Sequence, residues 1–123
     1  MESEKFVTSI KEYVRDASIS DTIEFIKKPP GRKPRKRHVE LSNWFNSLSD
    51  EDRHMIRKMM EEAVDSAIFG FFGVIDGVRT IEESQEKTKF ELYGVREGIS
   101  TKINEDGNEF LHDIYNALTN PTD

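Results

Sequence analysis

Cysteine is absent from this chain of 123 residues. The chain therefore has no disulfide framework, no thiol nucleophile and no cysteine-based zinc site. Long apolar runs are absent as well: the charge-free stretch Ser66–Ile75 is far shorter than the roughly 20 residues that cross a bilayer. The first residues, MESEKFVTSI, include early acids and no apolar run, so no signal peptide is expected. These absences predict a cytoplasmic protein without a membrane segment.

Motifs of catalysis are also lacking. The histidines His38, His54 and His112 do not occur at His-x-x-x-His spacing, and neither a Gly-x-Ser-x-Gly elbow nor a glycine-rich phosphate loop is present. The closely spaced acids of residues 61–65 lack the Glu-x-x-His pairs of a di-metal bundle, which favours a solvated helix face. We therefore expect a non-enzymatic protein, with no catalytic residue, no metal ligand and no cofactor.

The longest segment with one consistent pattern is Ser49–Gly77, which we predict to be a helix around which the rest of the chain packs. Ser49 is a suitable N-cap, and the three acids after it lie where the helix dipole is positive. Apolar residues then recur every three or four positions as one face: Ile56, Met59, Met60, Ala63, Val64 and Ala67. At about 1.5 Å per residue this helix spans roughly 40 Å, the full width of a domain of this size.

The second half of this helix has a different composition. From Ser66 onward no polar face remains, which predicts burial on all sides. Gly70 and Gly73 each cost about 1 kcal/mol in a helix interior, and we expect close approach of another element at both positions. If part of Phe69–Phe72 stays uncovered, the resulting apolar patch would mark a homodimer or partner surface.

The corner after the helix is expected to be structural. Gly77 suits the left-handed position that ends a helix. Asp76 and Arg79 flank it, and we predict that they form an ion pair that fixes the corner.

Shorter helices are predicted before the central one. Glu2–Ala17 carries an apolar stripe, Ser18–Ser20 interrupt it, and residues 21–27 form either a second short helix, which we favour, or a short strand. The stripe consists of Phe6, Ile10, Tyr13, Val14 and Ala17. A further short helix within His38–Leu48, ending at Ser47–Ser49, is expected to deliver Trp44 and Phe45 to the core.

After the central helix the apolar period changes to two. Val78–Ile81 is a candidate first strand, and Lys89–Arg96 with Ile99–Ile103 predicts a hairpin around a Glu97-Gly98 turn. A closing helix follows, capped by Asn108 or Asp106 and stopped at Asn120-Pro121. The predicted fold class is therefore α+β: one domain over residues 1–123, mostly helical, with a small antiparallel sheet of two or three strands.

The most unusual segment is Lys27–His38, with seven cations, three of the four prolines and no acid. Removing its charge from the formal net charge of −6 leaves −13 on the rest of the chain. Prolines and repulsion between like charges predict a flexible, extended loop. The candidate nucleic-acid-binding residues are its cations, Lys27, Lys28, Arg32, Lys33, Arg35, Lys36 and Arg37. Gly31–Arg35 resembles the core of AT-hook minor-groove binders, although Lys33 interrupts the Gly-Arg-Pro order.

The motifs WFNSLSDEDR, DSAIFGFFGVIDGVR, FELYG and LHDIYN occur in this order over the last two thirds of the chain. Their order resembles that of a family of small bacterial proteins without an assigned activity. The resemblance implies a shared fold unit and a bacterial source, and it assigns no catalytic residue.

Two classes of function are compatible with these features. The first is a small acidic binding protein that occupies a basic protein partner, similar in size and charge to the immunity proteins that block nuclease toxins. The second is a nucleic-acid-associated protein that uses the basic loop, with a steep dependence on salt. A small hydrolase is a third interpretation, for which no supporting constellation is found.

Overall fold

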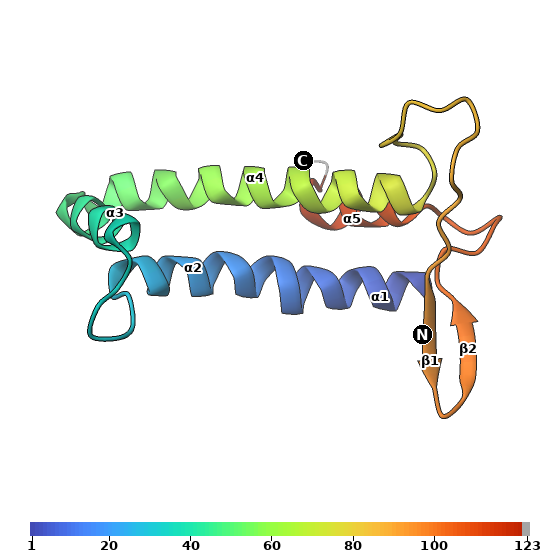
Figure 1. The fold of residues 1–123 in the computed structure, drawn as a ribbon, viewed down its shortest axis with the longest axis horizontal. Helices are drawn as coiled ribbons and strands as arrows, with labels where there is room; N and C mark the ends of the chain where they lie inside the picture. The colour runs from blue at the N-terminus through green and yellow to red at the C-terminus, as the bar shows by residue number, and fades with distance from the viewer. Residues whose placement is uncertain (122–123) are drawn as a thin grey trace.

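The structure, a computed structural model, describes residues 1–121 and has the predicted α+β architecture. Two long helical segments lie antiparallel and form a rod, with a short helix across one end and a hairpin at the other (Figure 1). In chain order the elements are α1 (Ser3–Ile10), the π-helical segment η1 (Lys11–Asp16), α2 (Ala17–Lys27), α3 (Lys36–Ser47), α4 (Asp50–Ile75), β1 (Tyr93–Arg96), β2 (Ile99–Lys102) and α5 (Leu111–Thr119).

The first of the two long helical segments, which we call the first rod, runs without a break from α1 through η1 to α2. The predicted interruption at Ser18–Ser20 is therefore wrong, and residues 21–27 are helical. The predicted stripe is also wrong after Ile10, because Tyr13 is 73% exposed. The wider π turn of η1 inserts about one extra residue per turn and so rotates the following residues. As a result Arg15 takes the inward position after Ile10, and Ile19 is buried one turn later.

Helix α4 begins as the sequence predicts. The Ser49 hydroxyl accepts a hydrogen bond from the Asp52 backbone N–H at 3.1 Å, which caps the first turn. The helix spans roughly 39 Å at 1.5 Å per residue. At its other end Gly77 has φ of +79°, the predicted left-handed conformation that favours glycine.

The main core lies at one end of the rod, where α1, α4 and α5 meet. Its buried members are Val7, Phe72, Ile103, Leu111, Ile114 and Tyr115. Phe72 contacts Phe6 and Tyr115 edge to face, with ring centroids 6.1 and 5.8 Å apart. The opposite end is thinner, because α2 and α3 bury only Ile19, Ser42 and Phe45.

The expected burial of the second half of α4 on all sides is wrong. Phe72 faces the core, whereas its neighbour Phe71 is 63% exposed. Met59 and the alanines of the predicted stripe are exposed as well. Helix α4 therefore has two apolar faces, an inner one against the first rod and α5, and an outer one that residues 1–121 leave uncovered along most of its length.

Trp44 does not enter the core as predicted, since it is 55% exposed, while Phe45 is buried. Helix α3 begins at Lys36, two residues before the predicted segment. No proline follows Pro34 until the far end of the chain, so nothing prevents the helix from starting this early. Trp44 and Phe45 are adjacent and so point about 100° apart on the helix, and the buried side of α3 is the one that carries Phe45.

At the thin end, backbone carbonyls in the last turn of one helix accept hydrogen bonds from side chains of the next helix. The Ser42 hydroxyl and the Asn46 amide of α3 donate to the Lys27 carbonyl at the end of α2, at 3.2 and 2.9 Å. Arg53 of α4 in turn donates to the Phe45 and Asn46 carbonyls at the end of α3, at 3.1 and 2.8 Å. These bonds add partners to carbonyls in the last turns of α2 and α3 and tie each helix to the next.

The hairpin forms around Glu97-Gly98 as predicted, with Arg96 paired to Ile99 and both turn residues at positive φ. Its strands are shorter than expected, and Val78–Ile81 is not a strand. Residues 76–92 instead form an irregular arm beyond the end of α4. Asn104 anchors this arm, because its amide donates to the Ile75 and Phe90 carbonyls at 3.0 and 2.8 Å.

Within residues 1–121, no helix is both long enough and apolar enough to cross a membrane.

Candidate binding surfaces

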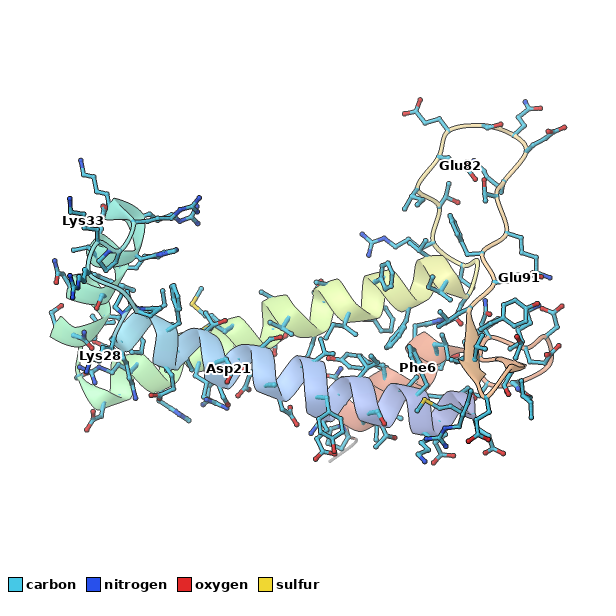
Figure 2. The ribbon with its side chains drawn as sticks, turned by 60° about the horizontal axis from the view of Figure 1, so that its bottom comes forward. Phe6, Asp21, Lys28, Lys33, Glu82 and Glu91 are labelled. Carbon is cyan, nitrogen blue, oxygen red and sulfur yellow. The ribbon has the colours of Figure 1, made fainter. Side chains whose placement is uncertain are left out.

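The predicted nucleic-acid-binding residues gather at the thin end of the rod. Lys28 and Lys33 lie at this end in Figure 2, far from Glu82 and Glu91 at the other. The extended part of the segment is shorter than predicted, because Lys27 ends α2 and the last two cations, Lys36 and Arg37, open α3. All seven cations are exposed.

The basic end is poorly neutralised by the protein itself. Among the described residues, Lys27 is the one cation of the seven in an ion pair, a 3.5 Å contact with Glu24. Lys36 and Arg37 occupy the first turn of α3, where the helix dipole disfavours positive charge, and Arg35 at the N-cap makes no capping side-chain bond. This end is therefore a local concentration of positive charge on an acidic protein.

The opposite end carries an acidic hollow of about 650 Å³. Four carboxylates line it, Glu2 and Glu4 from the start of the chain and Glu105 and Glu109 from the segment before α5. The hollow also borders residues 100–102 of β2. Lys102 is its one cation, and the bond to Glu91 at 3.2 Å raises the pKa of Lys102 and keeps it paired.

The β2 strand presents a free edge beside this hollow. The sheet has two strands, so β2 pairs with β1 on one side only. The Ile103 backbone N–H donates to the Leu92 carbonyl at 2.7 Å, so these two residues are a hydrogen-bonded pair. Hydrogen-bonded and non-hydrogen-bonded pairs alternate along the two strands from there. By that alternation the main-chain groups of Ser100 and Lys102 point away from β1. A further extended segment could pair there, next to the four carboxylates.

Asp76 has a structural role different from the one predicted. No Asp76–Arg79 ion pair occurs among the described residues. The Asp76 carboxylate, only 2% exposed, instead accepts from the Leu111 and His112 backbone N–H groups at 3.0 and 2.9 Å. It therefore caps α5, and the predicted caps Asn108 and Asp106 are wrong. The cap comes from 35 residues away in the sequence, which no local pattern could indicate.

The same carboxylate contacts His112 Nδ1 at 2.6 Å. This pair could orient a general base, so its surroundings decide its role. The other ring nitrogen lies 3.3 Å from Asp113, and Phe69 and Phe110 contact the ring with centroids 5.3 Å away. Both nitrogens face carboxylates and leave no place for a nucleophile, which favours a structural role.

A second buried network was missed by sequence reasoning, which placed Asp65 on a solvated face. Arg15 donates to both Asp65 oxygens at 2.9 and 3.0 Å, and the Tyr115 hydroxyl donates at 2.6 Å. The hydrogen bond to Asp65 raises the pKa of Arg15, and burial with the same carboxylate raises the pKa of Tyr115. Asp65 therefore links η1, α4 and α5. Arg15 follows Ile10 by five residues, which places both on one side only if a π turn lies between them. An α-helical period therefore could not indicate that Arg15 faces Asp65.

The glycines of α4 lie against the arm rather than against another helix. A Cβ on Gly70 would come within 2.0 Å of the Arg79 guanidinium, and a Cβ on Gly73 would lie 3.4 Å from Arg79 Cβ. Arg79 thus folds back over the helix end. Beside it the outer face of α4 forms an apolar hollow of about 610 Å³, bordered by Phe71 and Ile81.

No family model, curated protein or solved structure matches this chain, so the resemblance to a bacterial family stays a prediction. Within residues 1–121 no three histidine or acidic side chains converge as a metal site would require.

Proposed function

We propose that the protein is a non-enzymatic binding protein whose acidic end takes up a basic, extended segment of a protein partner. The observation that carries this proposal is the coincidence of two features. Four carboxylates, Glu2, Glu4, Glu105 and Glu109, line one hollow, and the unpaired edge of β2 borders the same hollow.

Each feature supplies a different part of recognition. Main-chain hydrogen bonds to a strand edge contribute affinity for any extended chain. Carboxylates beside the edge favour lysine and arginine at alternate positions and accelerate the encounter. A partner with those properties is a basic protein, and a small acidic protein that occupies such a partner would act as its inhibitor, as immunity proteins do for nuclease toxins.

The test uses a synthetic extended peptide with lysine at alternate positions, and the same peptide with glutamate as a control. Titration into the full chain is followed by backbone amide shifts. We expect only the lysine peptide to bind, with shifts over residues 99–102 and weaker binding at high salt.

A variant pair locates the site. Changing the four carboxylates to glutamine removes charge at constant shape, and we expect it to weaken binding by about tenfold or more. The matched control changes four exposed glutamates elsewhere to glutamine: Glu12, Glu40, Glu51 and Glu62. Equal loss in both variants, or no binding of the lysine peptide at low salt, would reject the proposal.

A second candidate, nucleic-acid association through the basic end, is favoured by one observation. Six of its seven cations have no acidic partner among the described residues: Lys28, Arg32, Lys33, Arg35, Lys36 and Arg37. A gel-shift series tests it with Lys33, Arg35, Lys36 and Arg37 changed to alanine. Loss of a salt-dependent shift would support the candidate, whereas an unchanged shift, or none for the parent at low salt, would remove it.

A further inference from the structure

The outer face of α4 carries a stripe without charge, which we call the outer stripe: Met55, Met59, Ala63, Ser66, Gly70 and Val74. These residues recur at spacings of three and four, so they share one side of the helix. Met59 is 71% exposed and Met55 53% exposed. Gly70 is buried, and the atoms nearest to it outside its own helix belong to the Arg79 guanidinium of the arm. A helix face of this kind, apolar over five turns, is expected to be buried.

The exposed surface area of the chain is larger than that of a compact monomer, which indicates that a further molecule covers part of it. The structure exposes 9483 Å² for a mass of 14.3 kDa. A compact monomer of this mass exposes about 6,800 Å². The difference exceeds the roughly 800 Å² that each partner contributes to a stable interface.

Charge at the two ends indicates which neighbour fits. The basic loop lies beside the start of α4, and the acidic arm with Glu82 lies beside its end (Figure 2). Two copies packed in parallel would superimpose like charges, whereas antiparallel packing brings each basic end to the acidic end of the other copy. The stripe residues are uncharged, and the charged group recorded against them, the Arg79 guanidinium over Gly70, does not favour a basic protein.

We propose that this chain forms a twofold-symmetric dimer in which the outer stripes of two α4 helices pack antiparallel. With the twofold axis near Ala63 and Ser66, the small residues allow the helices to approach closely. Met59 of each copy then lies opposite Gly70 of the other, beside the hollow of about 610 Å³, whose lining is apolar apart from Ser66 and the Arg79 side chain over Gly70. The acidic hollow beside β2 lies on other elements, so the dimer does not rest on the proposed function.

Sedimentation equilibrium of the full chain tests this proposal. We expect a mass of twice 14.3 kDa, and we expect Met59→Lys to raise the dissociation constant at least about tenfold while circular dichroism stays unchanged. Tyr13→Lys is the matched control, because Tyr13 is equally exposed but lies on the first rod. A monomer at every concentration, or equal weakening by both variants, overturns the proposal.

Cross-linking tests the direction of packing, since the chain has no cysteine of its own. Ala63→Cys lies near the axis and should form a disulfide between copies on mild oxidation. Met55→Cys should not, because the two positions would be about 28 Å apart along the helix. Cross-linking of Met55→Cys, or none of Ala63→Cys in a dimer, would overturn the antiparallel arrangement.

Discussion

The two ends of the rod differ in what holds them together. At one end α1, α4 and α5 enclose an apolar core, and buried carboxylates of Asp65 and Asp76 tie the helices to one another. At the other end α2 and α3 bury few side chains, and the helices are joined by hydrogen bonds to helix-end carbonyls and by an edge contact between the Phe25 and His38 rings. The first end therefore provides most of the stability.

The two ends also differ in the charged surface that each one carries. The thin end carries the unpaired cations, which would repel one another most strongly in a tightly packed structure. The packed end carries the acidic hollow and the strand edge on a firm base. The thin end concentrates cations that lack ion pairs among the described residues, and the packed end carries the acidic hollow.

The largest expected effect is the loss of core packing at the packed end. Phe72→Ala should lower the free energy of unfolding by about 4 kcal/mol, because it leaves a cavity among Phe6, Tyr115 and their neighbours. Tyr13→Ala, at an exposed aromatic position, should change it by less than about 0.5 kcal/mol. Urea denaturation measures both. Equal losses would show that the core is not where the structure puts it.

The next effect is the loss of the long-range helix cap. Asp76→Ala should cost about 3 kcal/mol, because it removes a buried carboxylate that accepts three hydrogen bonds. The control is Asp113→Ala, which removes an exposed acid from the same helix turn and should cost about 0.5 kcal/mol. If thermal melting ranks the two variants the other way, Asp76 is not the cap of α5.

A smaller effect concerns the Asp65 network. Tyr115→Phe should cost about 1.5 kcal/mol at neutral pH through the lost hydrogen bond to a charged group. Burial raises the pKa of the Tyr115 hydroxyl, so its stabilising contribution is complete below about pH 10 and is lost as pH rises further. The parent should therefore lose stability above pH 10 more steeply than Tyr115→Phe. Parallel pH profiles would contradict the assigned hydrogen bond.

The smallest effect is expected at Gly70, where the sequence suggested a tight contact with another element. The neighbouring atoms belong to the mobile end of the Arg79 side chain, which can move aside. Gly70→Ala should thus gain up to about 1 kcal/mol from helix propensity. A loss of more than about 1 kcal/mol in chemical denaturation would show that Arg79 is held rigidly.

Local patterns predicted the elements well. The Ser49 cap, the glycine end of α4 and the Glu97-Gly98 hairpin each depend on a few adjacent residues, and all three are confirmed. The fold class is confirmed as well. Predictions failed where a distant residue decides the outcome, as with the cap of α5, or where the helix period changes, as with Tyr13 in η1.

Which face of a helix is buried was harder to predict. Helix α4 has two apolar faces, and composition alone could not tell that the first rod covers just one of them. The same ambiguity led to the prediction that both Trp44 and Phe45 enter the core, whereas only Phe45 of the two is buried. The candidate surfaces were partly predictable: the basic segment is evident in the sequence, whereas the acidic hollow joins residues more than 100 positions apart.

Hydrogen exchange resolved by residue tests the contrast between the two ends most directly. We predict that amides in residues 64–75 and 111–118 exchange only through global unfolding, while those in residues 36–47 open at a lower free energy. The acidic hollow would then be supported by the most stable part of the chain. Equal opening free energies along the rod, or greater protection in α3 than in α5, would contradict this account.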